Sequence, residues 1–268
     1  MIIRASILVL MLAALLQAQT FDAVSIKMST AESERGSEGG PGTSRPGEYT
    51  FGKATLGDFI ATAYDVSFFQ VSSKAPLDKE RFDLVAKVPA GATKDQFRTM
   101  LKNMLVERFH LKLQTIQKEF DAYELQVAKT GPKLKVSDSD LSKAFAPGNG
   151  FPTVVATKKL TSMMSNFSGH TITRMTGRQA TLANIASMLR VPDERPIVDR
   201  TNLSGTYDFT LEFANDTPGA VPDAASAPPS LPDMESALRQ QLGLLLVRAK
   251  APFDVLVIES FDQRPTDN

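Results

Sequence analysis

The chain has 268 residues, in which 30 lysines and arginines balance 30 aspartates and glutamates, so the formal net charge at pH 7 is zero. This balance gives no electrostatic reason to expect nucleic acid or an anionic membrane surface as a partner. The sequence contains no cysteine, which excludes disulfides, thiolate metal sites, cysteine nucleophiles and a lipid-bearing N-terminal cysteine.

The first 18 residues, MIIRASILVLMLAALLQA, predict an export signal. Arg4 supplies one positive charge, an apolar run follows from Ala5 to Leu16, and Ala18 is a small residue near the expected cleavage site. A transmembrane anchor is the alternative, but this run is shorter than the roughly 20 residues that span a bilayer. We therefore expect a periplasmic or secreted protein that has no transmembrane segment once the signal is removed.

Two amphipathic helices are predicted to begin in the same way. The tripeptide Ala-Thr-Leu occurs at 54–56 and again at 180–182, and each copy opens an apolar pattern with helical spacing. In the first copy the threonine and Asp58 resemble a capping box, and in the second Asn184 gives a weaker version. The shared start is the first sign of an internal repeat.

A second similarity lies in two strands with alternating apolar and polar residues, which indicates one buried and one solvated face. The apolar positions are Phe82, Leu84, Ala86 and Val88 in the first strand, and Tyr207, Phe209, Leu211 and Phe213 in the second.

The longest similarity aligns residues 105–127 with 238–260 without a gap. Both segments are predicted to contain a helix end, a strand, a turn and another strand. The first helix begins at Thr93 with Gln96 as a capping box, and the second begins near Asp233. We therefore expect an α+β fold, a tandem repeat of two βαββαββ-type modules whose helices pack on one face of small mixed sheets.

The repeat and the composition predict a domain organisation. Residues 32–48 and 215–233 are rich in glycine, proline and small residues, and are predicted to be loops. The expected order is a signal peptide at 1–18, a first α+β repeat at 19–136, a linker at 137–165 and a second α+β repeat at 166–268.

The two histidines, His110 and His170, have no local partner that would make either one catalytic. The sequence has no G-x-S-x-G nucleophile pattern, no H-E-x-x-H metal pattern and no glycine-rich phosphate loop of the expected spacing. We therefore assign no catalytic, cofactor-binding or metal-binding residue and expect no cofactor.

The segment 195–209 is the densest local signal and is predicted to form a hairpin. Its candidate interaction residues are Arg195, Asp199, Arg200 and Tyr207. In the functional interpretation, Asp199 and Arg200 form an ion pair that faces a ligand. In the alternative, Asp199 caps the turn and Arg200 pairs with a neighbouring carboxylate.

The last strand, near 254–261, offers a second candidate interaction site at Val255, Val257 and Glu259. If this strand lies at a sheet edge, it could pair with a strand from another protein. If it is a central strand, its backbone is fully paired. The sequence leaves both arrangements open.

Four segments, 21–27, 81–89, 105–112 and 195–213, resemble a family of uncharacterised exported proteins abundant in soil acidobacteria. The resemblance covers nearly the whole mature chain and implies no established activity. In some relatives the same module is attached to membrane metallopeptidases of the antibiotic-sensor type, which implies a sensing or interaction role outside the cytoplasm. The run 234–244 is also similar to the short N-terminal domain of secretins and TonB-dependent receptors, which binds protein partners in the periplasm.

These observations favour an exported, non-enzymatic binding or interaction module with a protein partner in the envelope or outside the cell. They do not favour nucleic acid as a partner. The alternative hypothesis is an extracytoplasmic hydrolase with a site between the two repeats, which would need convergent acid, base and nucleophile groups.

Overall fold

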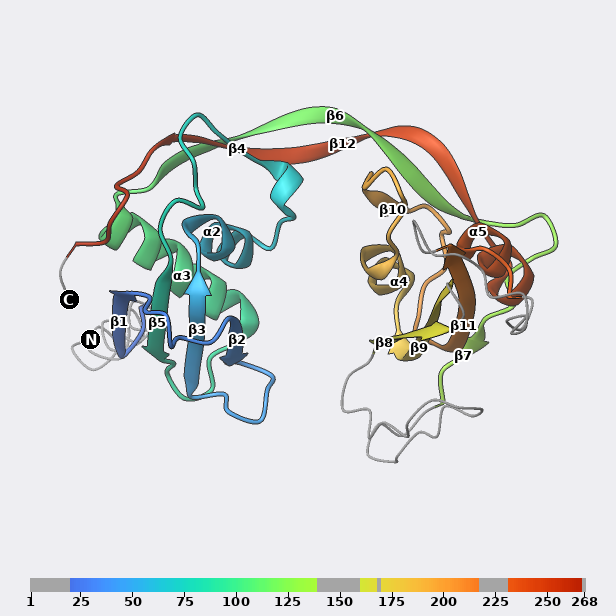
Figure 1. Cartoon of the computed structure of the whole chain (residues 1–268), viewed down its shortest axis with the longest axis horizontal. Helices are drawn as coiled ribbons and strands as arrows, with labels where there is room; N and C mark the ends of the chain where they lie inside the picture. Colours follow the sequence, from blue (N-terminus) through green and yellow to red (C-terminus); the bar gives the residue numbers. More distant parts are fainter. Residues whose placement is uncertain (1–19, 139–159, 168–169, 217–230, 267–268) are drawn as a thin grey trace, which may run out of the picture. The chain divides into compact units, whose positions relative to one another are not determined.

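The computed structural model describes residues 20–138, 160–167, 170–216 and 231–266 (Figure 1). The predicted signal at 1–18 and residues 139–159 of the predicted linker lie outside these ranges. Small sheets, many strands and four α-helices make up the described part of the chain, which confirms the α+β class at this coarser level.

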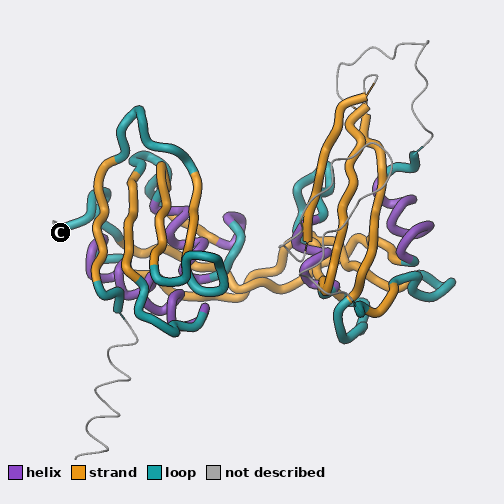
Figure 2. Tube along the Cα trace, turned by 90° about the horizontal axis from the view of Figure 1, so that it is seen from below, coloured by secondary structure: helices purple, strands orange, loops and turns teal. Residues whose placement is uncertain are grey.

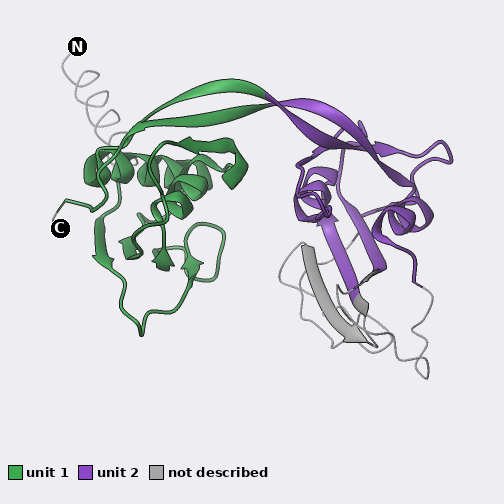
Figure 3. Ribbon diagram, turned by 45° about the horizontal axis from the view of Figure 1, so that its top comes forward, with its two compact units in different colours: residues 1–118, 253–268 green, residues 119–252 purple. Residues whose placement is uncertain are grey.

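The chain divides into two compact units (Figure 3). Unit 1 comprises residues 1–118 and 253–268, and unit 2 comprises residues 119–252. The chain therefore leaves unit 1 and returns to it, and each passage falls within a long strand.

Unit 1 contains a four-stranded antiparallel sheet in the order β1-β5-β3-β2. Its strands are β1 (Ala23–Met28), β2 (Gly36–Gly39), β3 (Glu48–Ala54) and β5 (Phe82–Lys87). The alternation in β5 is confirmed, because Phe82 and Leu84 are buried. The strand β2 lies inside a predicted loop, so that prediction was wrong there. Pairing with β3 uses only backbone groups, and the largely exposed sequence GSEG has no apolar period to reveal it.

Two α-helices cover this sheet, α2 (Leu56–Tyr64) and α3 (Lys94–Phe109). Both begin with the predicted capping boxes, because the side chains of Thr55 and Thr93 accept the backbone N–H of the residue three positions later. The ring of Phe109 packs against those of Phe59 and Phe82, at centroid distances of 6.3 and 5.3 Å. These aromatic contacts join both helices to the sheet.

A second sheet has the order β10-β6-β12-β4. Its strands are β4 (Val71–Ser73), β6 (Lys112–Val127), β10 (Ile197–Asp199) and β12 (Leu244–Ser260). A one-turn 3-10 helix, η1 (Phe68–Gln70), leads into β4. The short strand β4 is parallel to β12, and β10 is parallel to β6.

Both long strands are continuous, as Figure 2 shows, so the strand-turn-strand prediction for 105–127 and 238–260 was wrong. The 16 residues of β6 include no glycine, proline or asparagine, but β12 is continuous although it contains Pro252, so turn-forming residues do not decide the outcome. A pair of short strands and one continuous long strand would show the same alternating pattern of residues. Only the strands that each segment pairs with distinguish these two arrangements.

Unit 2 has a four-stranded antiparallel sheet in the order β7-β11-β9-β8. Its strands are β7 (Lys135–Val136), β8 (Leu160–Phe167), β9 (His170–Ala180) and β11 (Tyr207–Asp216). Helix α4 (Leu182–Met188) begins at a capping box, and α5 (Met234–Ala237) continues as the π-helical turn η2 (Leu238–Leu242). Phe209, Leu211 and Leu238 are among the buried residues of this unit.

Each unit has its own hydrophobic core. The core of unit 1 includes Leu256 and Ile258 from β12, although the rest of it comes from residues before 112. The core of unit 2 includes Tyr123 and Leu125 from β6. The compact units therefore do not coincide with the two halves of the sequence.

Candidate functional site

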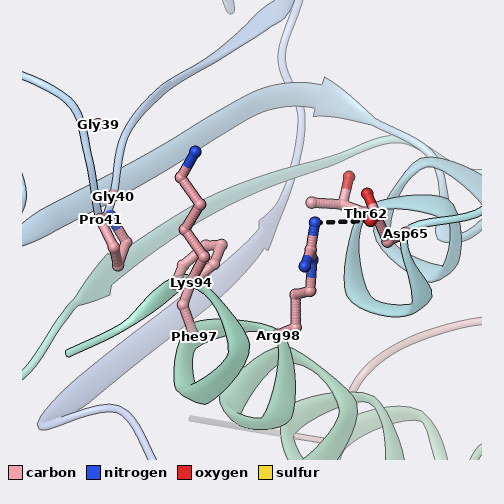
Figure 4. Close-up of a pocket in the computed structure, with 8 residues that line it drawn as sticks. All are labelled: Gly39, Gly40, Pro41, Thr62, Asp65, Lys94, Phe97 and Arg98. Carbon is pink, nitrogen blue, oxygen red and sulfur yellow. Dashed lines mark ion pairs between the residues drawn. The ribbon is translucent and has the colours of Figure 1, made fainter. Parts of the chain in front are cut away.

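One cavity of about 240 Å³ in unit 1 lies between the loop after β2 and the first turns of α3 (Figure 4). Arg98 lines it and is held by two carboxylates, at 2.7 Å from Asp65 and 3.1 Å from Asp95. Lys94 also lines it and forms no ion pair with a described residue. Because the charge of Arg98 is already compensated, this cavity offers an anion a single exposed lysine.

Tyr49 lies near this cavity, and its ring contacts Phe97 edge-on at 4.8 Å between centroids. Burial raises the pKa of Tyr49 to about 12, although hydrogen bonds to Ser37 and Thr62 lower it. The phenol therefore stays protonated at neutral pH. It is a hydrogen-bonded core group and not a base for proton transfer.

A second cavity, of about 370 Å³, includes Asp83 of β5 in its lining. The carboxylate of Asp83 accepts hydrogen bonds from the hydroxyls of Ser29 and Ser33 and from the backbone N–H of Lys53. Burial raises the pKa of Asp83, but these hydrogen bonds outweigh burial and the net pKa is lowered. This carboxylate is committed to joining three segments of unit 1.

A third cavity, of about 340 Å³, borders strand β4. We call it the edge cavity, because β4 is the last strand of its sheet. Phe68, Val71 and Leu77 form its apolar wall. The side chain of Phe68 is unusually accessible for a phenylalanine, with 61% of its surface exposed. An exposed aromatic beside an open strand edge is typical of a surface that binds another polypeptide.

The edge cavity also contains two arginines, Arg35 and Arg81, and two aspartates, Asp58 and Asp78. Asp58 is engaged in the capping box of α2. Arg81 donates one hydrogen bond to the carbonyl of Lys53 at 3.1 Å. Neither arginine forms an ion pair with a carboxylate in the described part of the chain. Both guanidinium groups can bind an acidic group of a ligand, and the exposed Asp78 can bind a basic group.

The predicted hairpin at 195–209 was wrong, because β10 and β11 belong to different sheets. Strand β10 pairs with β6, and β11 pairs with β9 and β7. The four candidate residues bind separate neighbours: Arg195 lies 3.0 Å from Asp193, Asp199 accepts from Thr201, Arg200 lies 3.8 Å from Glu124, and the buried Tyr207 donates to Ser204. Asp199 therefore accepts hydrogen bonds within the turn and Arg200 lies near a carboxylate of β6, as the alternative interpretation of these two residues expected.

The second candidate site, at Val255, Val257 and Glu259, lies on a central strand. Strand β12 has β6 on one side and β4 on the other. Val257 itself is paired with Ser72 of β4. An edge role for these residues is therefore wrong, because the parallel strand β4 covers the side that would otherwise be open.

His110 ends helix α3 as its C-cap, with a left-handed φ of 46°. Its Nδ1 lies 2.7 Å from Oδ2 of Asp262, and both side chains are more than half exposed. His170 is the first residue of β9, and the structure does not describe its side chain. Among the described residues no cluster of three or more histidine, aspartate or glutamate side chains could hold a metal ion. No described helix is long and apolar enough to cross a membrane.

A family model described as "Protein of unknown function (DUF3738)" matches residues 57–261. The chain belongs to this family. The DUF3738 match begins in α2 and ends just after β12, so it includes residues of both units. No curated protein matches this sequence significantly, and no solved structure does.

The edge cavity is not apparent from the sequence alone. Its one local signal is the pair of adjacent phenylalanines at 68–69, which lies between a predicted helix and a predicted strand without the period of either. The arginines come from segments far apart in the sequence, so only the fold brings them to the aromatic wall.

Proposed function

We propose that this chain is an exported, non-enzymatic binding module, built from two copies of one repeat, that binds an extended acidic polypeptide at the edge cavity of unit 1. The observation that carries the proposal is the open edge of β4, which lies beside an apolar wall and two arginines that form no ion pair within the described residues. The partner would be a protein of the envelope or the extracellular space.

The order of the strands supports the repeat. In both antiparallel sheets, numbered along the chain, the first strand pairs with the fourth, the fourth with the third, and the third with the second. A helix with a threonine capping box follows the third strand each time, as α2 and as α4. Neither agreement is expected of two unrelated α+β units.

A network of polar groups supports the repeat at the level of atoms. Asp208 of β11 accepts the hydroxyl of Ser137 and, at 3.0 Å, the backbone N–H of Gln179. Asp83 of β5 accepts a serine hydroxyl and the N–H of Lys53 in the same way, also at 3.0 Å. Lys53 and Gln179 have left-handed φ values of 49° and 50°, although neither is glycine. Such backbone strain persists where the surrounding structure fixes it, so its recurrence supports a common origin.

Binding of an extended segment follows from the backbone of β4. A strand at a sheet edge presents unpaired N–H and C=O groups, which can form hydrogen bonds with a strand from a partner. Alternate side chains of that partner would then point toward one face. An apolar side chain could fill the cavity beside Phe68, and an acidic side chain could bind Arg35 or Arg81.

The test measures the binding of nine-residue peptides to the full mature chain by fluorescence anisotropy. Three peptides share alternating apolar positions and carry glutamate, glutamine or lysine at the polar positions. We expect the glutamate peptide to bind most tightly. The changes Phe68→Ala and Arg35→Glu should each weaken it at least about tenfold, the effect of losing an interface anchor.

Val106→Ala is the matched control, because Val106 is an exposed apolar residue of α3 that does not line the edge cavity. This variant should bind the glutamate peptide like the parent protein. The proposal fails if the lysine peptide binds as well as the glutamate peptide, or if all three variants bind equally.

A further inference from the structure

We infer that the two repeats have exchanged their last strands within one chain, so that each compact unit is completed by a strand from the other repeat. This inference rests on the repeat proposed above. The acceptor site in unit 1 would bind the end of β12, and the acceptor site in unit 2 would bind the end of β6.

The exchange is visible in the registers of the two parallel strand pairs. Strand β4 of the first repeat pairs with Leu256–Ile258 of β12, in the second repeat. Strand β10 of the second repeat pairs with Tyr123–Leu125 of β6, in the first repeat. The ungapped alignment of 105–127 with 238–260 places Tyr123 opposite Leu256 and Leu125 opposite Ile258. The two parallel pairings therefore use equivalent residues, each taken from the other repeat.

The hydrophobic core of each unit likewise contains residues from the last strand of the other repeat. Leu256 and Ile258 are buried in the core of unit 1 with residues of α2 and α3. Tyr123 and Leu125 are buried in the core of unit 2 with residues of α4 and η2. Removing either strand would expose the apolar residues of a core that belongs mostly to the other repeat.

The segments that follow the two strands are anchored reciprocally as well. After β12, the N–H of Asp262 donates to the carbonyl of Phe109 at 2.8 Å, at the end of α3. After β6, the N–H of Lys133 donates to the carbonyl of Leu242 at 2.9 Å, at the end of η2. Phe109 and Leu242 are equivalent in the same alignment. The two carbonyl acceptors are therefore equivalent, although their donors lie at different positions, two residues after β12 and six residues after β6.

The continuous course of β6 explains why the strands are exchanged. A turn near Glu119–Asp121 would let the strand fold back and place Tyr123–Leu125 beside β4 of its own repeat. The strand instead continues into unit 2, although Asp121 is a residue type that turns favour. Strand β12 is continuous in the same way through Pro252, the position equivalent to Glu119. Exchange of an identical element is a low-cost way to join two copies of a fold, and here both copies lie in one chain.

The absence of native cysteine permits a direct test in the full chain. Ser72 is paired with Val257, and Val198 is paired with Glu124. Directly paired residues present their side chains on the same face at a separation that a disulfide can bridge. The exchanged double variants are therefore S72C with V257C, and E124C with V198C.

The control double variants use the same four positions in the unexchanged combination, S72C with E124C, and V198C with V257C. Each cysteine thus occurs once in an exchanged pair and once in a control pair, which matches its reactivity. Circular dichroism of the reduced proteins first establishes that each variant is folded. Dilute protein is then oxidised with oxidised glutathione, and free thiols and masses are measured.

We expect each exchanged pair to form a disulfide within a monomer, with the mass of the protein less two hydrogens. Each control pair should form no such disulfide, and each of its thiols should stay free or gain the mass of one glutathione. A disulfide within a monomer in the control pairs would overturn the inference. So would folded exchanged variants that form no disulfide, or that form one only between two copies. Peptide binding by the parent protein is measured separately, so failure of the proposed function is distinguishable from failure of the exchange.

Discussion

Tyr49 shows how a single buried side chain links the stability of unit 1 to pH. Only 5% of its surface is exposed, and its ring contacts those of Phe51 and Phe97. Burial disfavours the phenolate more than hydrogen bonds to Ser37 and Thr62 favour it, so the pKa rises to about 12. The unfolded chain would release the same proton near pH 10.

We predict that Tyr49→Phe flattens the loss of stability at high pH. Between pH 10 and pH 12 the unfolded state loses the phenol proton and the folded state keeps it, so the unfolding free energy falls as pH rises. For a raised pKa of about 12, this loss amounts to about 2 to 3 kcal/mol in the parent protein. Urea unfolding at intervals from pH 9 to pH 11.5 measures the difference between parent and variant.

Tyr64→Phe is the matched control for this prediction. Burial also raises the pKa of Tyr64, but this side chain is only partly buried. The control should flatten the curve less than Tyr49→Phe does. Parallel stability curves for the parent and Tyr49→Phe would contradict the assignment of the high-pH loss to Tyr49.

At the scale of elements, the sequence predicts the features that residues close together in the chain determine. The capping boxes at Thr55, Thr93 and Thr181 form as expected, because their hydrogen bonds span three residues. The buried stripe of α3 and the alternation of β5 and β11 follow from helix and strand periods. These features need no knowledge of distant partners.

The sequence does not predict which strands pair across long distances. The expected hairpin at 195–209 requires β10 to choose β11, yet β10 pairs with β6, about 70 positions earlier. The edge cavity is missed for the same reason, because Arg35, Phe68 and Arg81 meet only in the folded unit. Period and turn chemistry determine local conformation but leave the partners of each strand open.

We predict that Val257→Pro strongly destabilises unit 1. The residue lies on a central strand, so proline removes a ladder hydrogen bond whichever neighbour its N–H faces. The lost bond, the unpaired carbonyl and the adjacent buried Leu256 and Ile258 should together cost on the order of 3 kcal/mol. Thermal unfolding followed by circular dichroism measures this loss.

Val257→Thr provides the control, because threonine keeps the backbone donor and the β-branched shape that strands favour. Its melting temperature should stay close to that of the parent protein. If Val257→Pro melts like the parent while remaining folded, β12 is not paired on both sides at this position.

At the scale of the whole molecule, the region matched by the family model includes residues of both compact units. The match at 57–261 runs through α2, both long strands and the sheet of unit 2 without being confined to either compact unit. Reciprocal strand exchange would account for this continuity, because neither unit could complete its core from one half of the chain. A module of this kind would have to fold as a whole.

We predict that the exported protein lacks its first 18 to 20 residues. The charge, apolar run and small residue at 1–18 match a signal peptide. The fold limits how far cleavage can extend, because the ring of Phe21 contacts that of Phe97 at 5.8 Å and the N–H of Asp22 donates to the carbonyl of Lys87. Intact-mass measurement of protein from the native envelope or culture medium should therefore show a chain that begins between Gln19 and Phe21.

In the control, Leu8→Arg with Leu12→Arg interrupts the apolar run and should leave the protein inside the cell with its signal uncleaved. A parent protein found in the envelope or the medium with Met1 still attached would refute the signal peptide.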